Sequence, residues 1–112
     1  MHALPSAPWF LFRSGEDVFA LSLSSIREVA YREVVPPAPG APEDVLGRLN
    51  VHGNIVPLID LGGVTFVEPT LAVIAATPEG ALVAYAADEI LGVHEDRPDS
   101  RLIEAHLPLE AA

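Results

Sequence analysis

The chain has 112 residues, half of them hydrophobic, and its 16 acidic against six basic side chains give a net charge of −10. The lack of cysteine excludes disulfides and thiolate ligands, and the negative charge disfavours phosphate backbones and anionic lipid, so we expect no nucleic-acid or membrane partner. The apolar runs 71–76 and 81–87 are far shorter than the roughly 20 residues of a membrane span, and residues 1–15 lack a signal peptide's basic start, so we expect one soluble, cytoplasmic domain.

The first predicted element is a hairpin. Residues 9–12 form a short, largely apolar strand, and the polar run 14–17 supplies a turn. Residues 18–23 form the return strand, because their apolar side chains alternate and place one hydrophobic row on one face.

A short helix is predicted after this hairpin. Ser25 and Glu28 have the spacing of a capping box, in which the serine caps the first turn and the glutamate reaches back to a free amide. We therefore expect a helical turn over about 25–28 and a strand over about 30–35. The proline-rich run 36–42 can form neither a helix nor a paired strand, and is predicted to be a stiff loop.

The most regular pattern lies in residues 45–61, VLGRLNVHGNIVPLIDL. Residues 45–51 alternate with the period of a strand, and His52-Gly53 can form a tight turn because glycine tolerates a positive φ. Residues 55–59 are apolar at every position, so this strand must be covered on both faces. The segment predicts a hairpin in a barrel or a two-layer packing.

The remaining elements are shorter. Strands are predicted over 71–77 and 81–87, around the turn Pro78-Glu79-Gly80. One helical turn over 88–91 and a last strand over 92–95 are expected to follow. The tail over 97–112 has a mixed pattern that is compatible with partial helix around residues 100–106.

Residue types for catalysis or metal binding are present without the spacing that such chemistry needs. The four histidines form no helical pair and no HxH or HExxH motif, so no metal site is expected. Ser24 or Ser25, with His52 and Asp60, would supply the types of a catalytic triad, but no nucleophile elbow occurs. Asp60 is instead expected to accept backbone donors in the turn after its strand. We predict no enzyme activity and no cofactor.

Residues 47–61, GRLNVHGNIVPLIDL, resemble the signature motif of CheW-like chemotaxis coupling domains, G-x-x-N-hydrophobic-R-G-x-hydrophobic-hydrophobic-P-hydrophobic-hydrophobic-D-L. The matching residues are Gly47, Asn50, Val51, Gly53, Ile55, Val56, Pro57, Leu58, Ile59, Asp60 and Leu61. The chain departs from the family where His52 replaces the usual arginine, and Gly62 replaces an arginine that often follows the motif. The weaker similarity of the flanking segments extends over about residues 10–96, which identifies the chain as a short, divergent member.

The resemblance implies a mainly β fold, with two SH3-like β-barrels and one or two very short helices. It implies a single domain over residues 1–112, with a first barrel region over 10–61, a reduced second barrel over 70–96 and a tail over 97–112. The closing hairpin of ordinary members has no counterpart after Glu95, so we expect a second barrel truncated at the C-terminus and sheet edges left open.

The resemblance also implies a non-enzymatic adaptor that docks on the helical signalling domain of a methyl-accepting chemoreceptor. Docking on a CheA-like histidine kinase is expected to be weakened or lost, because one partner surface is absent or reshaped. The alternative is a generic SH3-like interaction module, or a self-associating one, in an unrelated assembly.

Four positions correspond to partner-binding residues of the family: Ile26, Glu28, Gly47 and His52. Each also has a purely structural interpretation. Ile26 could pack in the core, Glu28 could complete the capping box, and Gly47 could permit close approach of another backbone. His52 could simply be an exposed turn residue, although its imidazole would make any contact sensitive to pH.

Overall fold

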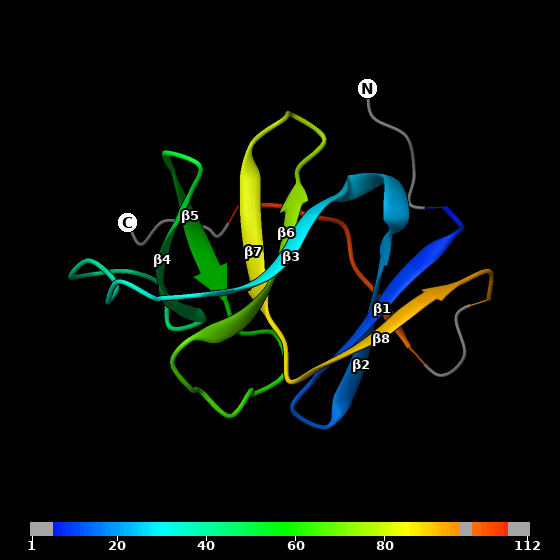
Figure 1. Cartoon of the computed structure of the whole chain (residues 1–112), viewed down its shortest axis with the longest axis horizontal. Helices are drawn as coiled ribbons and strands as arrows, with labels where there is room; N and C mark the ends of the chain where they lie inside the picture. The colour runs from blue at the N-terminus through cyan, green and yellow to red at the C-terminus, as the bar shows by residue number, and fades with distance from the viewer. Residues whose placement is uncertain (1–5, 97–99, 108–112) are drawn as a thin grey trace.

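The computed structural model describes residues 6–96 and 100–107, which form two β-sheets joined by a shared core (Figure 1). Four strands in the order β8-β1-β2-β9 make sheet A, and five in the order β3-β6-β7-β5-β4 make sheet B. The elements are β1 (Trp9–Ser14), β2 (Asp17–Ser22), the 3₁₀ turn η1 (Leu23–Ser25), β3 (Ile26–Arg32), β4 (Val45–Val51), β5 (Asn54–Ile59), β6 (Thr70–Ala76), β7 (Leu82–Ala86), β8 (Glu89–His94) and β9 (Arg101–Leu102). The predicted mainly β class is confirmed.

The chain between the first hairpin and β3 corrects one prediction. The helical turn is η1 (Leu23–Ser25), and β3 already begins at Ile26, so the expected helix over 25–28 is wrong. Ser25 does not cap a helix; its hydroxyl donates to the carbonyl oxygen of Ser22 at 2.8 Å. The reason is tertiary: β3 pairs along its length with β6, and that ladder outweighs an isolated helical turn, whose nucleation is costly.

The motif hairpin forms as predicted. β4 and β5 pair in antiparallel register up to Val51 and Asn54, and the two turn residues both have positive φ, 51° at His52 and 89° at Gly53. This combination is the tight turn that suits the twist of a hairpin. The side-chain oxygen of Asn50 accepts the Gly53 amide at 2.9 Å, which fixes the turn further. β5 is also paired with β7, so it is an interior strand of sheet B.

The second half of the chain corrects the predicted helical turn over 88–91. β6 and β7 form the expected hairpin, but residues 89–94 are strand β8 instead of a helical turn and a short strand. β8 pairs with β1, and the ladder continues through a bond from the Asp88 amide to the Arg13 carbonyl oxygen at 2.8 Å. Sheet A therefore combines both ends of the described chain.

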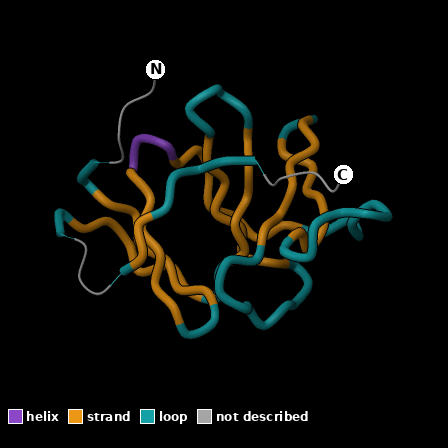
Figure 2. Tube along the Cα trace, turned by 180° about the vertical axis from the view of Figure 1, so that it is seen from behind, coloured by secondary structure: helices purple, strands orange, loops and turns teal. Residues whose placement is uncertain are grey.

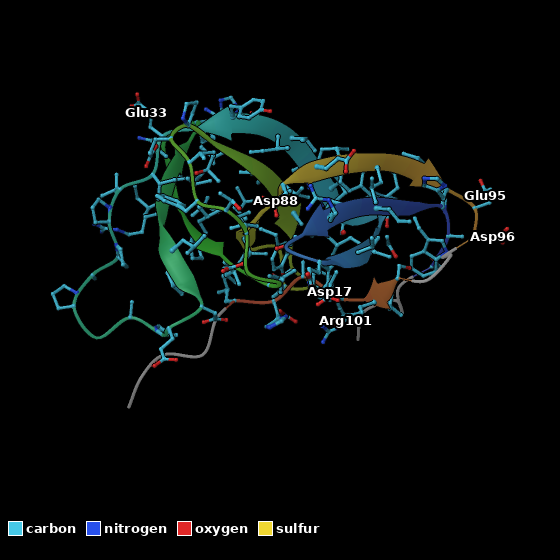
Figure 3. The ribbon with its side chains drawn as sticks, turned by 90° about the horizontal axis from the view of Figure 1, so that it is seen from below. Asp17, Glu33, Asp88, Glu95, Asp96 and Arg101 are labelled. Atoms are coloured by element: carbon cyan, nitrogen blue, oxygen red, sulfur yellow. The ribbon has the colours of Figure 1, made fainter. Side chains whose placement is uncertain are left out.

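The described part of the tail is also a strand where partial helix was expected. β9 pairs in parallel with β2, and the side chain of Arg101 donates to Asp17 at 3.2 Å (Figure 3). The segment after β9 then crosses between the sheets, as Figure 2 shows from behind. Its Ala105 is buried in the core, and the His106 amide donates to the hydroxyl of Tyr85 at 3.3 Å. The rest of the tail prediction, on 97–99 and 108–112, lies outside the described residues.

Two apolar clusters organise the interior. The first lies between the sheets and joins residues from both: Phe10, Phe12, Phe19, Leu21, Ile59, Val73, Ala75, Val83, Tyr85, Ala87 and Ala105. The second lies inside sheet B: Leu49, Val51, Val56, Leu58, Ala72, Ile74, Ala84 and Ala86. Alternate residues of β6 and β7 belong to different clusters. This explains why these strands are apolar at nearly every position. On β5, both faces are covered only toward its end, and Ile55 is 66% exposed, contrary to the expectation for residues 55–59.

Candidate docking surface

Two of the four predicted site residues meet on one side of sheet B. Glu28 lies on β3, and His52 lies at the tip of the β4–β5 hairpin, with its Nε2 atom 2.9 Å from Oε1 of Glu28. The other carboxylate oxygen of Glu28 accepts from the guanidinium of Arg32, four residues along the same strand. The capping-box interpretation of Glu28 is therefore wrong, because its carboxylate links two strands and caps no helix.

The electrostatics of Glu28 follow from these two contacts. The hydrogen bond from His52 is the larger influence and the one from Arg32 the second, and together they hold the pKa of Glu28 below its usual value. A carboxylate that accepts hydrogen bonds from cationic donors is stabilised in its charged form. Glu28 and Arg32 are sheltered, with side chains 28% and 26% exposed, whereas His52 is 74% exposed.

Gly47 lies where sheet B closes on itself. β3 and β4 are the two edge strands, and beyond β3 the residue Val35 exchanges two backbone hydrogen bonds with Arg48, of 2.9 and 2.8 Å. A Cβ atom on Gly47 would lie 2.3 Å from the Val35 carbonyl oxygen and 2.5 Å from Cγ1 of Val34. The glycine is therefore needed for close backbone approach, and this position has a structural role.

Ile26 lies on β3, two residues before Glu28. It is the first residue of β3, partly buried, and packs against the cluster between the sheets. Its side chain therefore contributes to the core. The structure brings Glu28 and His52 together, and leaves Ile26 and Gly47 in positions that the fold itself explains.

An apolar groove that sequence reasoning missed lies beside β3. Its walls come from β3, from the loop between β5 and β6, from the start of β6 and from the segment between β7 and β8, and its volume is about 190 Å³. The lining residues are Tyr31, Val64, Thr65, Val67, Thr70, Leu71, Ala87 and Asp88. Tyr31 is 66% exposed and Val67 55%, and the neighbouring Val29 and Phe66 are also exposed. The apolar residues Val29 and Tyr31 alternate along β3, and this pattern could have indicated an apolar strand face beside the groove. The incorrect helix prediction over 25–28 obscured it.

Two carboxylates fix the loops around the groove by accepting backbone amides. Asp60 accepts the amides of Gly63 and Val64 at 2.8 and 3.0 Å, as predicted for a carboxylate that ends an apolar strand. Asp88, which Figure 3 shows between the two sheets, accepts the amides of Gly15 and Thr65 at 2.7 and 3.2 Å. It thereby ties the first hairpin's turn to the loop. Within the described residues, no group of three potential metal ligands is assembled.

Together, the two sheets and the core that they share define a small, mainly β domain with an apolar groove on its surface. The family model for the CheW-like domain matches residues 8–105, and the chain belongs to that family. This confirms the resemblance carried by the motif hairpin. Two relatives of similar sequence, described next, are named chemotaxis proteins.

Two curated relatives are similar over most of the chain. The chemotaxis protein CheW of Rhizobium meliloti is 30% identical over 84 residues, which cover 70% of this chain and 54% of the relative. The chemotaxis protein CheW of Thermotoga maritima is 28% identical over 86 residues, covering 73% of this chain and 57% of the relative. The chain thus spans a little more than half the length of the relatives that it matches.

A solved structure shows the same fold. The crystal structure of the scaffolding protein TtCheW from Thermoanaerobacter tengcongensis superposes with a TM-score of 0.65 at 21% identity, and the match covers 80% of this chain and 64% of that one. The described part of this chain contains no helix with the length and apolarity that a membrane crossing requires.

Proposed function

We propose that this chain is a non-enzymatic coupling adaptor of a chemosensory pathway, which docks on the helical cytoplasmic signalling domain of a methyl-accepting chemoreceptor. Resemblance to the CheW-like family supports this, because its members couple such receptors to a histidine kinase. The single observation that carries the proposal is the exposed apolar groove beside β3. The assignment also implies a cytoplasmic location, where the receptor's signalling domain lies.

The groove, of about 190 Å³, has room for one or two partner side chains, such as the anchors of a helix that lies across it. A helix presents apolar anchors three and four residues apart, and a shallow apolar channel with aromatic walls is the usual receptor for such a stripe. Tyr31 supplies a large, rigid ring on one wall, and the Val67 side chain lies on the other. Interface aromatics of this kind carry a disproportionate share of binding energy. We therefore expect Tyr31 to dominate the contact.

The test uses two variants of equal exposure. Tyr31 on β3 and Ile55 on β5 are both 66% exposed, and both belong to sheet B, but Ile55 lines a separate hollow of about 570 Å³ beside the β6–β7 turn, so the pair also distinguishes the two surfaces. Binding of a receptor signalling-domain fragment is measured by calorimetry for the wild type, Tyr31→Ala and Ile55→Ala. Tyr31→Ala is expected to weaken binding by about tenfold or more, and Ile55→Ala by less than about twofold. A wild type that does not bind, or equal losses in both variants, would contradict the proposal.

We further propose that these 112 residues bind the kinase weakly or not at all. The matches to the two curated relatives cover only 54% and 57% of the relatives' lengths. A coupling protein needs two docking surfaces, and this limited coverage supports the proposal. Separate pull-downs with a receptor fragment and with a kinase regulatory domain, beside a full-length relative, test this. Kinase binding as tight as the relative's would overturn it.

A self-associating SH3-like module is the second candidate function. Sheet A supports it, because β8 and β9 are edge strands among the described residues and open edges invite pairing. Measurement of mass in solution separates the two functions. A stable oligomer that does not bind the receptor fragment would favour the second candidate.

A further inference from the structure

The seam between β3 and β4 is held in two different ways. At one end, Val35 and Arg48 exchange two backbone hydrogen bonds. At the other end, the contact between β3 and the hairpin tip is made by the side chains of Glu28 and His52. Backbone bonds of this kind do not titrate near neutral pH, whereas an imidazole does. Any pH dependence of the seam as a whole therefore comes from its side-chain end, and the backbone bonds at the other end report on its opening.

The partners of His52 lie on the inner face of the seam. In the register between β3 and β6, Glu28 is paired with Ile74 and Arg32 with Thr70, and Ile74 belongs to the cluster inside sheet B. The sheltered Glu28 carboxylate is shared between a permanent cation, Arg32, and a conditional one, His52. Protonation of His52 turns its hydrogen bond to the ionised carboxylate into an ion pair, which adds a coulombic attraction to the bond.

We propose that His52, Glu28 and Arg32 form a pH-sensitive latch that fastens the tip of the β4–β5 hairpin to strand β3. The latch is tightest when the imidazole is protonated and the carboxylate is ionised. Either change of charge weakens it: loss of the imidazole proton leaves a neutral donor, and protonation of the carboxylate removes the anion. An arginine at position 52, as the motif usually has, would keep the charge at every physiological pH.

The other charged groups near the latch do not reverse the expected direction of its pH dependence. On β3, Arg27 directs its guanidinium at the carbonyl oxygens of Ser24 and Ile26. The exposed Arg48 lies on β4, and the exposed Glu33 follows β3. Glu68, from the loop before β6, accepts the Val34 amide at 3.2 Å, beyond the end of β3. The β6 residues paired with Glu28 and Arg32 are not ionisable.

Amide hydrogen exchange at the seam tests the latch without any receptor, so the result does not depend on the proposed docking. Protection factors, corrected for intrinsic exchange, are measured for the Val35 and Arg48 amides at about pH 5.5 and about pH 8. In the wild type we expect protection to be about twofold to fivefold higher at the lower pH, the range that a partly exposed ion pair supplies. Core amides of the β6–β7 ladder serve as the internal control.

Two variants make the test decisive. Glu28→Gln removes the charge partner, so the pH dependence at the seam should disappear. His52→Arg should retain at about pH 8 the protection that the wild type shows only at about pH 5.5, since guanidinium stays charged. A carboxyl titration adds a second measurement: in His52→Asn, which keeps a residue tolerant of positive φ, the pKa of Glu28 should rise. Identical pH profiles in the wild type and Glu28→Gln would overturn the proposal.

Discussion

Gly47 is the residue at which a single added atom would disturb the closure of sheet B. The site of its missing Cβ faces the Val35 carbonyl oxygen at 2.3 Å, and that oxygen already accepts the Arg48 amide. The oxygen cannot move away without loss of the bridge. Family-based reasoning assigned Gly47 to a partner surface, but its surroundings give it a packing role.

Gly47→Ala is accordingly expected to lower the free energy of unfolding by about 1–3 kcal/mol, the usual cost of overpacking. Urea denaturation measures the change as a shift of the midpoint. Arg48→Ala is the matched control, because this exposed neighbour keeps its backbone bridge and should change stability by less than about 0.5 kcal/mol. An unchanged urea midpoint for Gly47→Ala would mean that the seam between β3 and β4 accommodates the added methyl group without loss of stability, contrary to this prediction.

At the residue scale, the sequence predicted the turns and hydrogen bonds formed between near neighbours. It did not predict which side chains far apart in the chain would contact each other. The positive φ at the His52-Gly53 turn and the backbone bonds accepted by Asp60 follow from neighbours a few positions away. The partners of Glu28 lie 4 and 24 positions away, on its own strand and at the hairpin tip. The same residue types at the same spacing fit both a capping box and a carboxylate that links two strands. Only the pairing of β3 with β6 decided between these two roles of Glu28.

The segment after β9 is one of the connections between the two sheets, and it belongs to no long ladder. It contributes buried Ala105 to the core and donates the His106 amide to the hydroxyl of Tyr85. Burial raises the pKa of Tyr85, and the bond from His106 opposes that rise only in part. A phenol whose pKa is raised in the folded state prefers to stay neutral there. The stability it supports is complete below about pH 10 and declines as pH rises above that value.

We therefore expect the free energy of unfolding to fall above about pH 10 in the wild type and to fall less in Tyr85→Phe. The chain has no lysine, since all six basic residues are arginines, so few other groups titrate in that range. Urea midpoints from neutral to strongly alkaline pH give the profile. Tyr31→Phe, at an exposed ring, is the control that should keep the wild-type decline. An equal decline in Tyr85→Phe would remove Tyr85 as its cause.

At the element scale, both hairpins of the first half and the β6–β7 hairpin were predicted because alternation and turn residues are local signals. The helical turns over 25–28 and 88–91 were wrong for a shared reason. Each segment holds residues compatible with one helical turn, and each instead completes a ladder, β3 with β6 and β8 with β1. Pairing over a whole strand satisfies more backbone groups than a single turn can.

At the scale of the whole molecule, the cluster between the sheets is the feature that decides how the chain unfolds. It takes Phe12 and Phe19 from sheet A and Val73 and Tyr85 from sheet B, with ring centroids of Phe12 and Tyr85 6.4 Å apart. Neither sheet can lose this contact without exposing apolar surface of the other. Two sheets that share a core in this way should melt together.

We predict a single cooperative transition, which would also support the expected single domain. The chain's one tryptophan, Trp9, begins β1 and reports on sheet A, while far-ultraviolet circular dichroism reports on both sheets. The two probes should give coincident urea curves. Phe12→Leu should shift both midpoints together. Loss of Trp9 signal ahead of the dichroism would instead mean that sheet A unfolds separately.

The sequence by itself determined the β class, the family, the motif hairpin with its turn, and the role of Asp60, because each depends on residues close together in the chain. Only the tertiary structure decided that β8 returns to β1, that Glu28 links β3 to the hairpin tip, and that Tyr31 lines a groove. These outcomes depend on which strands pair across long separations. That choice is made by the burial of two apolar clusters at once, which no local pattern encodes.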